Sequence, residues 1–121
     1  MAMTELIKEM ETAALAELNR ANANFPLFNS KHEGWAVIKE ELEETREALD
    51  DLESSVNVLW DDVRGKDIPG FIADFCTTDD IYRQAVAVAA EATQTAAMIL
   101  KYSMSLLEKA ESGVENGSIC D

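Results

Sequence analysis

The 121-residue sequence has few of the residues that build redox centres, histidine-based metal sites or disulfide frameworks. It contains two cysteines, Cys76 and Cys120, far apart along the chain, and a single histidine, His32. No Cys/His spacing typical of a zinc site or a disulfide framework is present, which favours a reducing, cytoplasmic setting. The sequence also has no nucleophile–base pair, glycine-rich phosphate loop or dinucleotide fingerprint.

Basic residues are also scarce. Ten Lys and Arg stand against 24 Asp and Glu, which gives a formal net charge of −14. A chain of this charge repels phosphate backbones and anionic lipids, so we expect neither nucleic acid nor a membrane as its partner. Divalent cations, metal-chelated phosphates and basic protein surfaces remain as partners. No run of about 18 apolar residues and no basic-then-apolar N-terminal signal occurs, which again indicates a cytoplasmic protein.

Three long segments have the periodicity of amphipathic helices, whereas strand signals are nearly absent. Apolar residues recur at steps of three and four, as on one face of an α-helix. The expected helices cover residues 4–23, 31–64 and 78–112, with a short helical piece at about 70–76. Residues 113–121 contain few apolar side chains and are expected to form a flexible tail. The sequence therefore predicts a single helical domain over residues 1–112.

Local signals mark the ends of these helices. Pro26 ends the first helix, because proline disfavours helical backbone at the residue before it, Phe25. Ser30 and Glu33 fit a capping box, in which each side chain accepts a hydrogen bond from the backbone of the other. Gly65 is expected to end the second helix.

The second helix has an unbroken heptad seam of about four repeats. Its members are Trp35, Ile38, Leu42, Thr45, Leu49, Leu52, Val56, Leu59 and Val63. At 1.5 Å per residue the helix is about 50 Å long, which is more than the rest of a small monomer can cover. We therefore expect an all-α fold, an antiparallel helical bundle with two long helices, completed as a homodimer or homotetramer.

The third helix has two adjacent apolar seams. One passes through Thr95, Ile99 and Tyr102, and the other through Ala96 and Leu100. Two seams predict contacts with at least two partner helices, and the many small residues between them favour close helix approach.

Glu91 is the only charged residue between Gln84 and Leu100. A carboxylate on so apolar a segment loses water on folding, and must be protonated, hydrogen-bonded, salt-bridged or bound to a cation. The second helix carries a dense acidic run over residues 40–44. Within it Glu41 and Glu44, three residues apart, share the flank that borders the core. Oxygen ligands from two helices suit Mg²⁺, so these three glutamates are the candidate metal ligands.

Each of these features also has an interpretation without a ligand. A run of glutamates on a long helix is more often a solvated face. A buried Glu91 can pair with Arg83, Lys101 or a tyrosine hydroxyl of another helix. These alternatives stay open at the level of sequence.

Three segments resemble stretches of the MazG-like all-α nucleotide pyrophosphohydrolases, particularly the short phage and prophage forms. They are FNSKHEGWAVIKEELEE at 28–44, LWDDVR at 59–64 and EATQTAAMILKY at 91–102. The resemblance covers about residues 24–108. In the short forms the first two stretches nearly abut. Here the 14 residues 45–58 separate them, and two heptads lengthen a helix without rotating its seam.

The resemblance implies hydrolysis of nucleoside triphosphates to monophosphate and pyrophosphate, with Mg²⁺ held by an E-x-x-E and an E-x-x-D pair. Glu41 and Glu44 match the first pair and Glu91 begins the second, whereas Gln94 stands at its last acidic position. The adjacent Glu40 is the candidate to orient the attacking water. Lys39, Arg83 and Lys101 are the candidates to contact the phosphates. Gln94, three residues after Glu91 on the same face, is the candidate to hydrogen-bond the base or a water beside the metal.

Two other functions remain in view. The first is a non-catalytic acidic helical binding protein of phage type, which sequesters a nucleotide or inhibits a host protein by occupying its basic site. Gln94 and the charge of −14 favour this alternative. The second is a purely structural coiled-coil oligomer, which the seam of the second helix supports but which leaves Glu91 unexplained.

Overall fold

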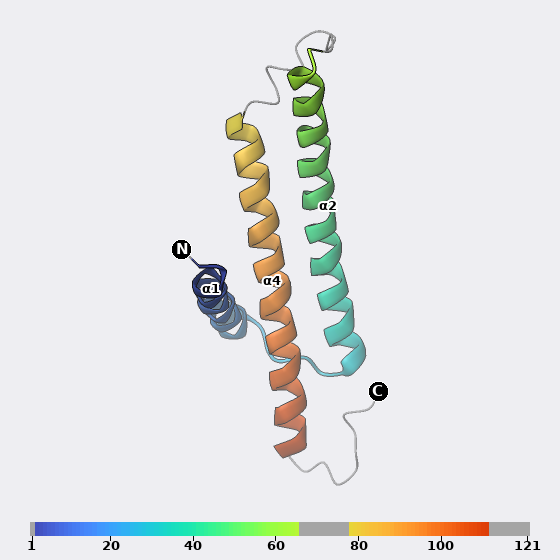
Figure 1. Ribbon diagram of the computed structural model, residues 1–121. Helices are drawn as coiled ribbons and strands as arrows, with labels where there is room; N and C mark the ends of the chain where they lie inside the picture. Colours follow the sequence, from blue (N-terminus) through green and yellow to red (C-terminus); the bar gives the residue numbers. More distant parts are fainter. Residues whose placement is uncertain (1, 66–77, 112–121) are drawn as a thin grey trace. The chain divides into compact units, whose positions relative to one another are not determined.

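The computed structural model describes residues 2–65 and 78–111, which form three α-helices without a β-strand in these ranges (Figure 1). Helix α1 spans Met3–Asn24, α2 spans Lys31–Val63 and α4 spans Thr78–Glu111. The predicted all-α class is confirmed, and the three helical ranges agree with the predicted ones to within one residue at each end. The short helical piece predicted at 70–76 and the tail predicted at 113–121 lie outside the described residues.

The helix ends follow from their local chemistry. The Phe25 amide donates to the Ala21 carbonyl at 2.9 Å, and Phe25 itself is extended, as the following proline requires. Ser30 Oγ accepts the Glu33 amide at 3.0 Å, whereas Glu33 Oε1 accepts the amide of Asn29 at 2.9 Å. The capping box therefore forms with its return bond shifted by one residue. Gly65 adopts φ +73°, which glycine reaches without steric cost, directly after α2.

The chain divides into two compact units. The first comprises residues 1–42 and 92–121, and the second comprises residues 43–91. The core of the first unit joins α1 to α4 and to the segment that precedes α2. It consists of Leu18, Phe28, Ala97 and Met98, flanked by Ala21, Val37, Ile38 and Tyr102.

Two hydrogen bonds in series hold the segment before α2 against α4. The Phe28 amide donates to Ser105 Oγ at 2.9 Å, and this hydroxyl donates to the Lys101 carbonyl at 2.8 Å. Both side chains of α4 are buried, with 5% of Ser105 and 4% of Lys101 exposed. Ser105 thus provides an acceptor for the buried Phe28 amide, which would otherwise lose its hydrogen bonds to water on folding.

Gly34 allows α2 and α4 to approach closely in this unit. A methyl group at its Cα would lie 2.3 Å from Tyr102 Cδ1 and 3.1 Å from Phe28 Cδ2. Both values are shorter than ordinary van der Waals contact, so a larger residue would displace the two rings. The sequence reasoning did not single out this glycine.

The buried face of α4 differs from the two seams predicted for it. In the first unit its buried residues include Ala97 and Lys101, whereas the seam residues Ile99 and Leu100 are 48% and 39% exposed. The two seams were predicted from the spacing of mainly apolar side chains. The face that α1 and the segment before α2 cover is instead lined partly by small and polar residues, which carry no hydropathy signal.

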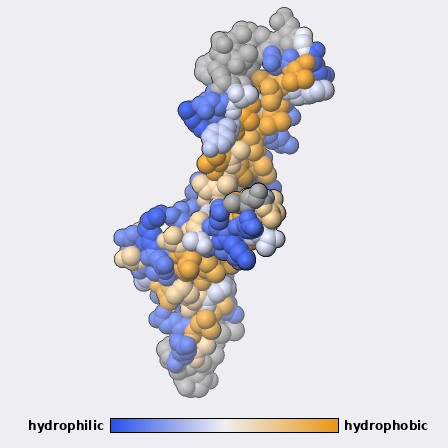
Figure 2. All heavy atoms as spheres, turned by 60° about the vertical axis from the view of Figure 1, so that its left-hand side comes forward, coloured by the Kyte–Doolittle hydropathy of each residue, from blue (hydrophilic) through white to orange (hydrophobic). Residues whose placement is uncertain are grey.

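The second unit leaves large apolar side chains exposed. On α2, Leu49, Val56 and Val63 follow each other at seven-residue spacing and are 51%, 45% and 66% exposed. The alternate seam positions Leu52 and Leu59 are half-buried. Figure 2 shows hydrophobic residues at the surface beside hydrophilic ones. One half of the heptad seam therefore packs within the chain while the other half stays accessible.

Within residues 2–65 and 78–111, no helix has the length and apolar character needed to cross a membrane.

Candidate metal centre

Three glutamates from α2 and α4 bring their carboxylates together. One carboxylate oxygen from each of Glu41, Glu44 and Glu91 lies within 4.8 Å of the other two. Glu44 and Glu91 belong to the same unit, and Glu41 precedes Glu44 by one turn of the unbroken helix α2. Side chains three residues apart on a helix are neighbours, so α2 alone sets the Glu41–Glu44 pair. The three residues predicted as metal ligands are thus the three that converge.

The three glutamates of the cluster differ in how far they are buried. Glu41 and Glu91 are half-buried, whereas Glu44 is exposed. Like charges at this spacing on a helix destabilise it by about 0.2–0.5 kcal/mol per pair, so a cation between the carboxylates would relieve repulsion. Oxygen ligands of one Mg²⁺ ion lie about 2.9 Å apart when adjacent and about 4.2 Å apart when opposite, from ligand distances near 2.1 Å. The limit of 4.8 Å within which the three oxygens lie is close to the spacing of opposite ligands.

The other predicted site residues of α2 are on its exposed surface. Glu40, the candidate to orient a water, and Lys39, a candidate phosphate contact, are both exposed. Glu40 is next to Glu41 in sequence but is not a member of the converging group. Consecutive residues on a helix point about 100° apart, which accounts for its separation from the cluster.

Arg83, another candidate phosphate contact, forms ion pairs along its own helix. Its guanidinium lies 2.7 Å from Asp79 and 4.0 Å from Asp80, in the first turn of α4. The Arg83 side chain is 71% exposed. Such surface pairs contribute little to stability, so they leave the guanidinium available to a stronger anionic partner.

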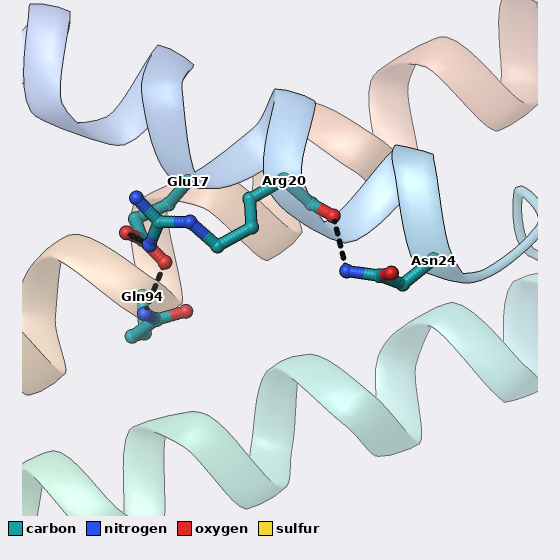
Figure 3. Close-up of polar contacts among 4 residues, drawn as sticks. All are labelled: Glu17, Arg20, Asn24 and Gln94. Atoms are coloured by element: carbon teal, nitrogen blue, oxygen red, sulfur yellow. Dashed lines mark hydrogen bonds and ion pairs between the residues drawn. The ribbon is translucent and has the colours of Figure 1, made fainter.

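Gln94 connects α4 to α1 (Figure 3). Its Nε2 donates to Glu17 Oε2 at 2.6 Å, and Glu17 Oε1 accepts a hydrogen bond from Arg20 in the same helix. The amide of Asn24 in turn donates to the Arg20 carbonyl at 3.0 Å. The structure thus places a carboxylate from α1 beside the position where the resemblance expects an acid. Sequence reasoning missed Glu17, because it lies on an acidic helix surface of ordinary appearance.

Lys101, the last candidate phosphate contact, is enclosed by aromatic rings. It is 4% exposed, and its ammonium lies 5.0 Å from the ring centre of Phe28 and 6.0 Å from that of Phe25. These distances are those of cation–π contacts, which stabilise a charge by about 0.5–2 kcal/mol. A separate hollow of about 370 Å³ is lined by Lys31, His32, Trp35 and Tyr102.

Comparisons with family models, with curated proteins and with solved structures give no match. The resemblance to the MazG-like group therefore rests on the three segments quoted above. What the geometry itself provides is a set of three carboxylates suited to a hard divalent cation, with a hydrogen-bonded carboxylate of α1 at Gln94.

Proposed function

We propose that the protein is a Mg²⁺-dependent, nucleoside triphosphate pyrophosphohydrolase-like enzyme that converts the triphosphate to the monophosphate and pyrophosphate. The observation that carries this proposal is the convergence of Glu41, Glu44 and Glu91 within 4.8 Å. Nucleoside triphosphates in solution with Mg²⁺ are magnesium complexes, so a protein with a charge of −14 can bind them through a shared cation rather than through basic residues.

The four glutamates would have different roles in the reaction. Glu41, Glu44 and Glu91 would hold the cation, and a bound cation would supply charge neutralisation for the phosphate oxygens and an activated water. Glu40, the residue before Glu41 on the exposed surface of α2, would be the base that takes a proton from the water that attacks phosphorus. The bridging phosphoanhydride bond breaks, and pyrophosphate leaves.

The phosphates and the base would be held by nearby side chains of α2 and α4. Lys39 is exposed on α2, two residues before Glu41. The hollow beside Trp35 and Tyr102 offers aromatic faces on which a base can stack. A partner subunit would supply further basic groups.

The same proposal includes an antiparallel arrangement of α2 and α4 and its completion by a second copy. The exposed half of the heptad seam supports this part. Leu42, Leu49, Val56 and Val63, four apolar side chains at seven-residue spacing along one face of α2, are between 41% and 66% exposed. Burying them against a second copy would stabilise a dimer, since each fully buried side chain of this size contributes about 1.5–3 kcal/mol.

A second candidate function follows from Gln94. Its amide donates to Glu17, and an amide cannot replace the acid of an E-x-x-D pair as an anionic ligand. A protein with a weakened cation site would bind a nucleotide without hydrolysing it. Release of pyrophosphate in the presence of Mg²⁺ supports the enzyme, whereas a rise in melting temperature with a nucleotide but without product supports the binding protein.

A further inference from the structure

The first unit contains a cavity that the proposed metal centre does not use. Its volume is about 470 Å³, within the range of small-molecule sites. The lining is formed by the end of α1, the segment before α2, and one face each of α2 and α4. Phe25, Phe28, Val37 and Met98 make it largely apolar, and none of the three converging glutamates belongs to it.

Lys101 is the cation of this lining. It is buried, and among residues 2–65 and 78–111 no carboxylate forms an ion pair with it. The acid that also lines the cavity, Glu33, instead accepts the Asn29 amide at the start of α2. The rings of Phe25 and Phe28 stabilise the ammonium but carry no formal charge, so an anion in the cavity would add an ion pair to these contacts.

We propose that this cavity binds a small aromatic anion, whose ring system packs between the phenylalanines and Met98 and whose negative group contacts the Lys101 ammonium. Charge complementarity supports this ligand. Lys101 is the buried charge of a largely apolar lining, whereas Glu33 is exposed and accepts the Asn29 amide, so the cavity favours an apolar body with one negative charge. Binding here needs neither a divalent cation nor a triphosphate, and so it stands apart from the proposed hydrolysis.

Two fluorescent dyes of nearly the same shape test the proposal on the full chain. The anionic dye is 1-anilinonaphthalene-8-sulfonate and the neutral one is N-phenyl-1-naphthylamine, both titrated in EDTA. Lys101→Met is expected to weaken binding of the sulfonate by about tenfold or more, because a charged hydrogen bond is lost. Binding of the neutral dye should persist, and Lys101→Arg should retain the preference for the sulfonate.

Lys8→Met is the matched control, since it removes an equal charge from an exposed position of α1. It should leave both titrations unchanged, and melting curves confirm that each variant folds. Val37→Trp, which fills the cavity, should weaken both dyes. Equal loss of sulfonate binding in Lys8→Met and Lys101→Met would overturn the proposal, as would unchanged binding in Lys101→Met.

Glu91→Gln separates this site from the metal centre. Sulfonate binding that is unaltered in this variant supports an independent cavity, whatever the outcome of the hydrolysis assay. Sulfonate binding that disappears in a folded Glu91→Gln protein would overturn the independence of the two sites.

Discussion

The side-chain amide of Gln94 donates a hydrogen bond of 2.6 Å to the carboxylate of Glu17, and so joins α4 to α1 (Figure 3). Glu91, three residues earlier on α4, is one of the converging glutamates. Residues three apart on a helix are neighbours, so the contact with α1 lies one turn from a candidate metal ligand.

Glu17→Ala and Gln94→Ala should each destabilise the protein by about 1 kcal/mol, because each removes one partner of a hydrogen bond to a charged group that is partly shielded. The double variant should lose clearly less free energy of unfolding than the two single variants lose together. Urea unfolding measures all three, with Glu9→Ala as an exposed acidic control on the same helix. Strict additivity would show that the two side chains do not interact in solution.

Gln94→Asp should have opposite effects with and without magnesium. Without the cation, a second carboxylate beside Glu17 replaces an attractive contact by repulsion, and the melting temperature should fall. With Mg²⁺ the added acid can join the other carboxylates, so the stabilisation by the cation should exceed that of the wild type. Melting curves across a magnesium titration measure both, and an equal magnesium response in the two proteins would exclude position 94 from the site.

Gly34→Ala should destabilise the protein, although alanine in a helix is more favourable than glycine by about 1 kcal/mol. The added methyl group would lie 2.3 Å from the Tyr102 ring, and overpacking of this kind costs about 1–3 kcal/mol. Adding Tyr102→Ala should recover part of the loss caused by the methyl group, which urea unfolding of the single and double variants measures. A more stable Gly34→Ala protein would show that the two helices are less close than described.

Val56→Glu should convert the protein to a monomer. It places a charge in the exposed apolar face of α2, whose burial against a second copy we propose. Light scattering after size-exclusion chromatography measures the mass, and circular dichroism should show unchanged helix content. Asn57→Glu, the neighbouring exposed residue, adds the same charge outside this face and should leave the mass unaltered. A wild-type protein that is monomeric at all concentrations would remove this part of the proposal.

Periodicity and capping signals were enough to predict the helices, because both are local. The convergence of Glu41, Glu44 and Glu91 was also predictable, since a lone charge on an alanine-rich segment has few stable surroundings and an i, i+3 pair is set by the helix itself. Their role as metal ligands stays a prediction.

The contacts that depend on the approach of separate helices were not predictable. Glu17 looks like any exposed acid of α1 until α4 lies beside it. The close approach of α2 and α4 at Gly34 did have a signal in the sequence. A glycine inside a long helix usually has a packing reason, because it destabilises the helix relative to alanine. The enclosure of Lys101 had no such signal, since a lysine on a helix is ordinarily solvated.

The most direct test is the release of pyrophosphate from a panel of nucleoside triphosphates, with Mg²⁺ and with EDTA. It compares the wild type with Glu91→Gln and with Glu43→Gln, an exposed glutamate of the same acidic run. Our account predicts release that requires Mg²⁺, disappears in a folded Glu91→Gln protein and persists in Glu43→Gln. Undiminished release from Glu91→Gln would contradict the site, and no release from folded wild-type protein with any triphosphate would contradict the enzyme.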